Sequence, residues 1–225
     1  MANKDMFLWW GSGSAPCWRA MLTLAEKGLW EGLPNELISF SEKGHKQEAI
    51  MKINPRGQVP TFKDGDTVVN ESGAICLYLE EKFKTQGSQL LPDDVTARSQ
   101  VYQYMYEVDN VKSNIMMPIV RYKMTTKPEN WNNDLLKEKY GPAGKEADTW
   151  NTYLKDKTYL CGDTFTMADV FFFPFLAALV RMGINLTSRP ELQRYYDLMS
   201  KRPSVQATWP PHYKESDGKD WLAEI

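Results

Sequence analysis

A strand, a tight turn and a helix start near the N-terminus constrain this fold more than any other feature. Residues Trp9–Arg19 read Trp-Trp-Gly-Ser-Gly-Ser-Ala-Pro-Cys-Trp-Arg. The apolar run Met6–Trp10 predicts a short buried strand, and apolar residues at helical spacing across Trp18–Leu29 predict a helix. Ser14 is suited to be the N-cap of that helix, and Pro16 is tolerated in its first turn.

The predicted helix start offers chemistry as well as structure. A helix N-terminus has free N–H groups and a partial positive charge, and both favour a bound anion. The hydroxyl of Ser14 and the thiol of Cys17 lie at this start. A serine before a helix also serves as a simple cap in many proteins, so capping alone is the alternative interpretation.

Composition excludes several classes of protein. The chain has 225 residues, of which 42% are hydrophobic and 25% charged, as in globular domains. A net charge of -2 without a basic block predicts neither nucleic acid nor an anionic membrane as partner. The longest apolar run, Val170–Val180, is too short to span a bilayer, and no signal peptide is evident.

Cysteine and histidine usage points to a reduced compartment. The three cysteines are odd in number and far apart in the sequence, so we expect free thiols and a cytoplasmic location. With only two histidines beside them, a metal site is not expected.

The pattern of secondary structure changes after residue 83. The first part predicts the order β-α-β-α-β-β-α, with strands at 6–10, 33–40, 59–62 and 67–70 and helices at 15–28, 45–53 and 71–83. The later part predicts helices only, at 95–125 with a bend at Pro118, 134–140, 145–156, 170–182 and 190–201, and an irregular tail. We therefore expect an α/β domain at 1–83, a linker at 84–94 and an all-helical domain at 95–225.

Four short motifs are each weak alone, but their order and separations along the chain are informative. They are Ser14-Ala15-Pro16-Cys17, Asn54-Pro55 with Val59-Pro60-Thr61, Glu71-Ser72, and the capping box Thr166-Met167-Ala168-Asp169. Together they resemble the cytosolic glutathione transferases, specifically the serine-type theta, zeta and delta classes and most closely the rho class of aquatic animals. The resemblance implies a thioredoxin-like N-terminal domain, an all-helical C-terminal domain and a homodimer. It assigns Asp169 a structural role.

The resemblance also implies a glutathione site, with glutathione as co-substrate and no other cofactor. Ser14 would donate a hydrogen bond to the thiolate. Glutathione would further contact a set of residues in the N-terminal domain: Ser12, His45, Lys46, Gln58, Val59, Pro60, Glu71 and Ser72.

In that family, each part of glutathione is bound by its own set of residues. A cis Val59-Pro60 bond would present the backbone of Val59 to the cysteinyl part, whereas an ordinary trans bond is the commoner case for any X-Pro. Glu71 and Ser72 would hold the γ-glutamyl end, or would only cap a helix. Gly57 departs from relatives that have Lys or His there, so His45, Lys46 or Arg56 would hold the glycyl carboxylate. His45 facing solvent is the alternative.

The implied reaction is conjugation of the glutathione thiolate to a small hydrophobic electrophile. Apolar residues of the long helix would contact the electrophile, although core packing explains each of them equally well: Tyr102, Met105, Tyr106, Met116 and Met117. Trp209 and Tyr213 are weaker candidates.

Two other functions stay open. A thiol–disulfide oxidoreductase would use Cys17, since a thiol in a first helical turn can have a lowered pKa, but a second cysteine three residues away is missing. A non-enzymatic carrier of apolar ligands would use the same binding residues without turnover.

Overall fold

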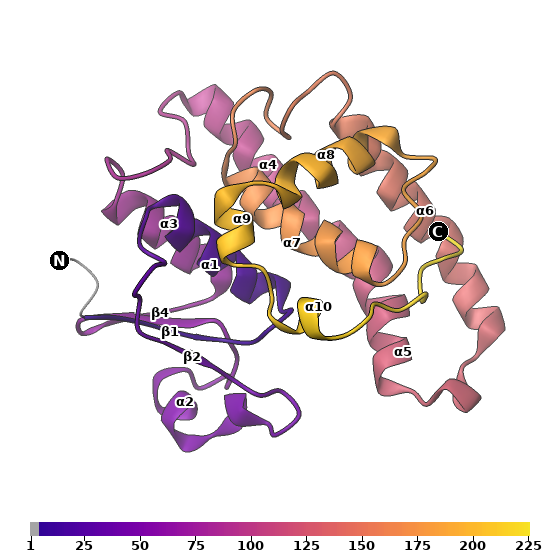
Figure 1. Cartoon of the computed structure of the whole chain (residues 1–225), viewed down its shortest axis with the longest axis horizontal. Helices are drawn as coiled ribbons and strands as arrows, with labels where there is room; N and C mark the ends of the chain where they lie inside the picture. Colours follow the sequence, from indigo (N-terminus) through magenta and orange to yellow (C-terminus); the bar gives the residue numbers. More distant parts are fainter. Residues whose placement is uncertain (1–4) are drawn as a thin grey trace. The chain divides into compact units, whose positions relative to one another are not determined.

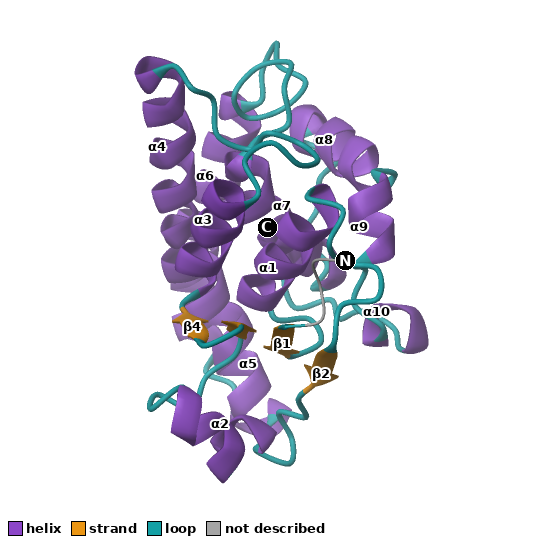
Figure 2. Ribbon diagram, turned by 90° about the vertical axis from the view of Figure 1, so that its left-hand side faces the viewer, coloured by secondary structure: helices purple, strands orange, loops and turns teal. Residues whose placement is uncertain are grey.

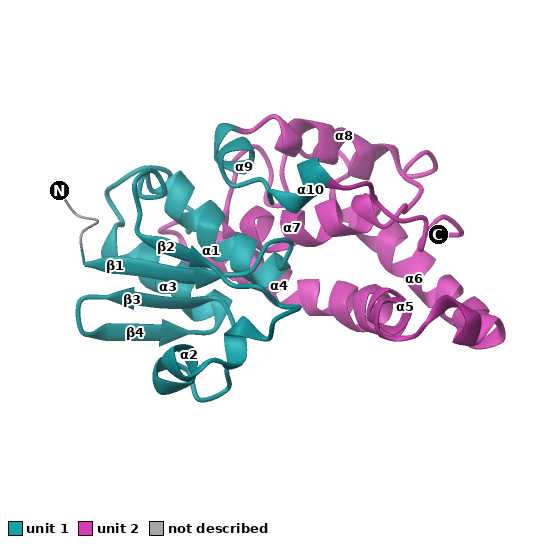
Figure 3. Ribbon diagram, turned by 60° about the horizontal axis from the view of Figure 1, so that its bottom comes forward, with its two compact units in different colours: residues 1–91, 203–215 teal, residues 92–202, 216–225 magenta. Residues whose placement is uncertain are grey.

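The computed structural model describes residues 5–225, and these form two compact units (Figures 1 and 3). Unit 1 holds the described residues through Leu91 together with Pro203–Glu215, called the tail segment below. Unit 2 holds Pro92–Arg202 and Ser216–Ile225. Leu91 falls inside the linker predicted at 84–94. The tail segment, which the sequence placed with the helical domain, instead belongs to the N-terminal unit.

Unit 1 is built on a four-stranded mixed sheet, whose strands are orange in Figure 2. The sheet order is β2-β1-β3-β4, with β1 at Met6–Trp10, β2 at Asn35–Leu37, β3 at Thr61–Asp64 and β4 at Thr67–Asn70. β1 pairs parallel with β2 and antiparallel with β3, so that Leu8 lies beside Phe62. The predicted order of elements is confirmed. β2 is shorter than predicted and its residues are exposed, as expected of an edge strand.

Helices cover both faces of this sheet. α1 (Ala15–Glu26) and α3 (Ser72–Lys82) pack together on one face, and α2 (Glu48–Ile53), preceded by the 3₁₀ turn η1 (Gly44–Lys46), lies on the other (Figures 1 and 2). The core is apolar: alternate residues of β1 are buried, α1 is buried on nearly all sides, and Ile75, Cys76 and Leu79 of α3 are buried as well. This is a thioredoxin-like arrangement.

A buried ion pair joins the two long helices of unit 1. Lys27 Nζ lies 2.6 Å from Glu80 Oε2, and both side chains are almost fully buried. Glu80 Oε1 accepts hydrogen bonds from the backbone N–H groups of Leu90 and Leu91, at 2.9 and 3.1 Å. The pair therefore fixes the end of the linker as well as the helices.

The tail segment follows the surface of α1. It forms two short helices, α9 (Pro203–Ala207) and α10 (His212–Glu215), where the sequence predicted irregular structure. α9 packs against α1, and the side chain of Ser204 donates a hydrogen bond to Glu26.

Unit 2 is entirely helical apart from one isolated bridge between Tyr159 and Gly162. Its elements are α4 (Val95–Val111), η2 (Lys112–Arg121), α5 (Tyr122–Thr125), η3 (Pro128–Asn130), α6 (Asn133–Tyr153), α7 (Met167–Arg181) and α8 (Pro190–Ser200). α4, η2 and α5 form the predicted helix 95–125. The part around Pro118 is a π-helix, which accommodates the proline. No helix among the described residues is long and apolar enough to cross a membrane.

α7 is the centre of unit 2, as predicted. Every residue from Met167 to Leu179 is buried. The capping box is present, since Thr166 and Asp169 each bond the other's backbone at the start of α7. Asp169 is fully buried and also accepts hydrogen bonds from the Leu160 N–H and the Tyr195 hydroxyl, which agrees with a structural role.

α6 corrects the prediction of two separate helices. The helix continues through Gly141-Pro142, where the sequence indicated a break. Pro142 removes one backbone hydrogen bond. One continuous buried side of the helix extends across the proline, formed by Leu136, Ala143, Ala147 and Trp150, and its burial outweighs that local cost.

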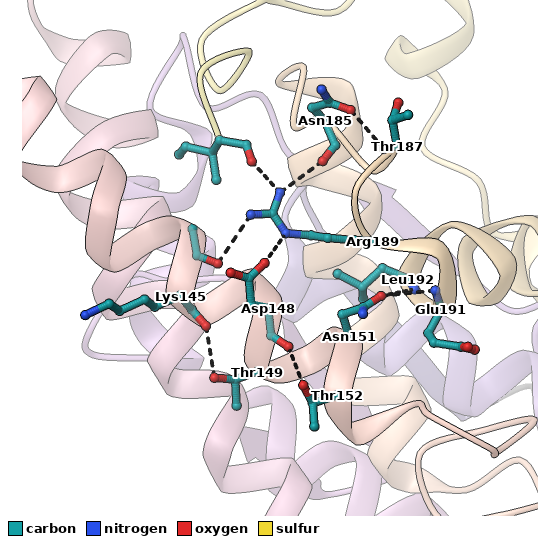
Figure 4. A network of polar contacts seen from close by, with 12 residues as sticks. Lys145, Asp148, Thr149, Asn151, Thr152, Asn185, Thr187, Arg189, Glu191 and Leu192 are labelled. Atoms are coloured by element: carbon teal, nitrogen blue, oxygen red, sulfur yellow. Dashed lines mark hydrogen bonds and ion pairs between the residues drawn. The ribbon is translucent and has the colours of Figure 1, made fainter.

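A polar network surrounds Arg189 in unit 2 (Figure 4). The Arg189 guanidinium donates to Asp148 Oδ1 at 2.8 Å, to the Asn185 carbonyl at 3.0 Å and to the carbonyl of Ile225. Asn151 accepts from the first N–H groups of α8. The last residues of the chain are thereby held against α6 and α8.

Candidate active site

The predicted turn between β1 and α1 is a β-turn over Gly11–Ser14. The Ser14 N–H donates to the Gly11 carbonyl at 3.2 Å, and Gly13 has a φ of +74° at the third position. A positive φ there is the mark of a type II turn and favours glycine. The turn ends on Ser14, so it determines where the Ser14 hydroxyl lies.

Ser14 is the N-cap of α1, as predicted. Its Oγ accepts a long hydrogen bond of 3.4 Å from the Cys17 N–H. The first turn of α1 carries no acidic side chain, and the helix is 12 residues long. Its N-terminus therefore keeps a partial positive charge beside a half-buried hydroxyl, an arrangement that stabilises an anion.

Cys17 faces the interior of unit 1. The side chain is fully buried and its Sγ accepts from the Gly11 N–H at 3.3 Å. Burial raises the pKa of the Cys17 thiol to about 11, although hydrogen bonds with Ser14 and Gly11 act in the opposite direction. The idea that its place in the first helical turn lowers this pKa is therefore wrong, because desolvation outweighs the helix N-terminus.

Ser12, at the second position of the turn, contacts the tail segment. Its Oγ lies 2.5 Å from Nδ1 of His212, and both side chains are half-buried. Sequence reasoning missed His212 entirely. No spacing rule connects two residues 200 positions apart, and α10, which carries His212, was not predicted.

A second helix start lies at Glu71-Ser72. Glu71 is exposed and has a φ of +73°, which is uncommon for a residue with a side chain. Its side chain makes no capping hydrogen bond to α3, and Ser72 is buried as the first residue of that helix. Strained backbone of this kind occurs often at ligand sites, and it leaves the N–H groups of α3 open to a carboxylate.

The Val59-Pro60 peptide bond is cis, as predicted. Before it, the Gln58 carbonyl accepts from Asn54 Nδ2 at 2.9 Å and from Thr61 Oγ1 at 3.1 Å. Pro60 is buried, Val59 is half-buried, and the Gln58 side chain is exposed. This segment is thus held by its own backbone contacts, with the Gln58 side chain left at the surface.

The basic residues near Gly57 are close to one another. Lys46 Nζ donates to the Arg56 carbonyl at 2.8 Å, and Gly57 lies beneath the Lys46 side chain with a φ of +54°. His45 is half-buried, with its ring 5.6 Å from that of Phe40. Its Nδ1 is buried without a hydrogen-bond partner among residues 5–225.

The residues predicted to contact an electrophile all lie in unit 2 and differ in exposure. Met105 is buried with Val101 and Val108, so it belongs to the core of that unit. The other four are accessible in part or largely: Tyr102, Tyr106, Met116 and Met117. Their role stays a prediction. Among the described residues no group of three or more acidic, cysteine or histidine side chains could hold a metal ion.

Comparison with known proteins shows which family this chain is similar to. Residues 12–87 match the model described as glutathione S-transferase, N-terminal domain, and residues 113–203 match the glutathione S-transferase, C-terminal domain. Glutathione S-transferase A of Pleuronectes platessa is 39% identical over 225 residues, 99% of each chain, and glutathione S-transferase Z2 of Arabidopsis thaliana is 32% identical over 93% of this chain and 92% of its own.

A solved structure extends the similarity to three dimensions. The crystal structure of a glutathione S-transferase from the Antarctic clam Laternula elliptica superposes with a TM-score of 0.90 at 48% identity, covering 99% of this chain and 100% of the clam chain. The match spans both units of the chain.

Proposed function

This chain belongs to the glutathione S-transferase family and is a glutathione transferase, and we propose that Ser14 activates the glutathione thiol in it. The single observation that carries this proposal is the position of the Ser14 hydroxyl at the positive end of α1, whose first turn has no acidic side chain. A hydroxyl hydrogen is rotatable, so Ser14 can donate to a sulfur while its oxygen accepts from Cys17 N–H.

The required stabilisation is modest. A free thiol has a pKa of about 8.5, and only the thiolate is a strong nucleophile. Lowering that pKa by one to two units takes roughly 1.4–2.7 kcal/mol. A charge-assisted hydrogen bond and a helix N-terminus are together sufficient for this. Ser14 acts as a hydrogen-bond donor and keeps its own proton.

The chemical step is a substitution at an electrophilic carbon. The bound thiol releases its proton to solvent, and the thiolate of glutathione forms a new carbon–sulfur bond. The leaving group, for example a halide, departs with the electron pair of the broken bond. Proximity of the two bound reactants supplies most of the remaining acceleration.

We extend the proposal to the rest of the glutathione site, with the residue roles that the family resemblance implies. The backbone of Val59 pairs with the cysteinyl part, and Gln58 lies beside it. Glu71 binds the ammonium group, while the Ser72 hydroxyl and the N–H groups of α3 bind the γ-glutamyl carboxylate. Lys46, with His45 nearby, binds the glycyl carboxylate. The support lies in the uncapped start of α3 and the position of Lys46 over Gly57.

The finer class and assembly are also proposals. We assign the chain to the serine-type transferases, because Ser14 is the N-cap of α1 within the motif that resembles theirs, and within them to the rho class. We further propose a cytoplasmic homodimer that uses no cofactor besides glutathione and accepts small hydrophobic electrophiles. Sedimentation at micromolar concentration tests the dimer, since a species of 25.9 kDa would contradict it.

One experiment separates this function from the alternatives. Conjugation of an aryl halide to glutathione and glutathione-dependent disulfide reduction are measured for the wild type, Ser14→Ala and Cys17→Ala. We expect conjugation to dominate, Ser14→Ala to reduce it by about ten- to thousandfold, and Cys17→Ala to keep most of it. Activity lost only in Cys17→Ala would indicate an oxidoreductase, and no turnover in any form would indicate a binder.

A further inference from the structure

We propose that His212 is a positioning residue for the reaction: its hydrogen bond to Ser12 holds the Gly11–Ser14 turn in the conformation that directs Ser14 to the sulfur. This inference rests on the proposed role of Ser14. The two residues belong to the same compact unit, since the tail segment is part of unit 1.

His212 meets the turn at its centre. It contacts the two central residues, which are the ones that set a turn's conformation. Nδ1 of His212 lies 2.5 Å from Ser12 Oγ, and its ring lies 2.4 Å from the point where a Cβ would stand on Gly13. Tyr213 lies 3.3 Å from the same point. Gly13 therefore permits both the positive φ and the close approach of the tail segment.

The tail segment is held by side-chain contacts with Trp18 and Trp30 before it reaches the turn. Thr208 Oγ1 accepts from Trp18 Nε1 at 2.8 Å, and the Ala207 carbonyl accepts from Trp30 Nε1 at 3.2 Å. The rings of Trp209 and Tyr213 then lie edge-on to Trp18, with centroids at 5.3 and 6.2 Å. These contacts fix α10, so His212 reaches Ser12 from a rigid support.

A loosened turn would displace the Ser14 hydroxyl. Ser14 is the last residue of the turn and the first of the helix cap, so its hydroxyl moves with the turn. A small misplacement of the group that stabilises the thiolate lowers the fraction of bound glutathione that is ionised, which reduces turnover more than glutathione binding. Glutathione affinity depends on the separate contacts at Glu71, Ser72 and Val59. The bond between His212 and Ser12 should therefore affect kcat and leave KM for glutathione nearly unchanged.

Three substitutions of His212 separate the hydrogen bond from ring packing. In His212→Asn an amide atom occupies the place of Nδ1, so the bond to Ser12 can form without the ring. His212→Phe keeps a ring over Gly13 and loses the bond, and His212→Ala loses both. Lys214→Ala is the matched control, because Lys214 is exposed on the same short helix. Melting temperatures identify any variant that fails to fold.

We expect kcat for aryl-halide conjugation to fall about fivefold in His212→Ala and His212→Phe, the factor of one neutral hydrogen bond. KM for glutathione should stay within about twofold. At saturating glutathione, the apparent pKa in the pH profile of kcat/KM for the aryl halide should rise. His212→Asn and Lys214→Ala should resemble the wild type. The double variant Ser12→Ala/His212→Ala should lose no more than either single variant.

Two results would overturn the proposal. Wild-type kcat and pH profile in all His212 variants would show that the contact has no role in the reaction. Activity retained by His212→Phe and lost in His212→Asn would assign the effect to the ring and refute the hydrogen bond. Ser14→Ala is measured in the same series: if it leaves kcat unchanged, the proposed function itself fails, whereas an effect of Ser14→Ala alone refutes only the role of His212.

Discussion

Lys46 occupies the space in which a side chain at Gly57 would lie. Its Cδ is 2.9 Å from the position of a Cβ on Gly57, and Met51 Sδ is 2.5 Å from the same point. We therefore propose that Lys46, which reaches this place from η1, takes the role of the Lys or His that several relatives are expected to have here. The sequence alone could only offer Lys46 as one of three substitutes, because the approach of η1 to Gly57 is a tertiary contact.

Gly57→Lys should therefore weaken glutathione binding instead of restoring a family feature. The new side chain would meet Met51 and Lys46 and would need a positive φ, so we expect a stability loss of about 1–3 kcal/mol and a higher KM for glutathione. Denaturant unfolding and steady-state kinetics test this. Lys46→Ala should raise KM while leaving stability nearly unchanged. A Gly57→Lys variant that binds glutathione more tightly would refute the assignment of Lys46.

Glu71→Ala should raise KM for glutathione several-fold, with a smaller effect on kcat. In the proposed site Glu71 binds the ammonium group, which is remote from the sulfur, so the contact should be similar in the ground state and the transition state. Glu81→Ala is the control, since Glu81 is an exposed acid of the same helix. Unchanged glutathione affinity in Glu71→Ala would remove this residue from the site.

Asp169 should make the stability of the protein depend on pH. Burial raises its pKa to about 6, against hydrogen bonds from Leu160, Thr166 and Tyr195 that lower it. Because the native pKa lies above the unfolded value of 3.8, protonation favours the folded state. The contribution of protonated Asp169 to the free energy of unfolding is complete below pH 3.8 and is lost as the pH rises through about 6.

The comparison with Asp169→Asn isolates this titration. The variant should be less stable at every pH, because an amide cannot accept all the hydrogen bonds of the carboxylate. When the pH falls from 7 to 4.5, the free energy of unfolding of the wild type should increase by about 1–3 kcal/mol relative to that of the variant. Chemical unfolding of both proteins at several pH values measures the difference. A difference that shrinks toward acid pH would mean that hydrogen bonding outweighs desolvation at Asp169.

The three cysteines should react with a thiol reagent at different stages. Burial raises the pKa of both Cys17 and Cys76 to about 11, and both side chains are fully buried. Cys161 is only partly buried. We expect the native protein to be labelled at Cys161 alone, with the other two reacting after denaturation. Fast native labelling of Cys17, located by mass spectrometry, would revive the oxidoreductase interpretation.

Local signals in the sequence were sufficient for most elements. The capping residues Ser14 and Thr166 marked the starts of α1 and α7. The error at Pro142 arose because a proline is a local signal, whereas the buried side of α6 is stabilised by tertiary packing.

The candidate site was predictable where it lies on helix starts and not where distant segments meet. The hydroxyl of Ser14 and the pair Glu71-Ser72 follow local rules of capping and anion binding. The contact between Ser12 and His212 and the buried pair of Lys27 with Glu80 join distant segments, and no periodicity indicates them. The pKa of Cys17 depended likewise on burial, which the sequence could not supply.

The most direct test of the central claim is the titration of glutathione bound to the enzyme, followed by the ultraviolet absorbance of the thiolate. In the wild type the bound thiol should titrate about one to two pH units below the free value of about 8.5. In Ser14→Ala it should return toward the free value, while the control Ser99→Ala, an exposed helical serine, should behave as the wild type. A bound thiol that titrates identically in Ser14→Ala and the wild type would contradict the account.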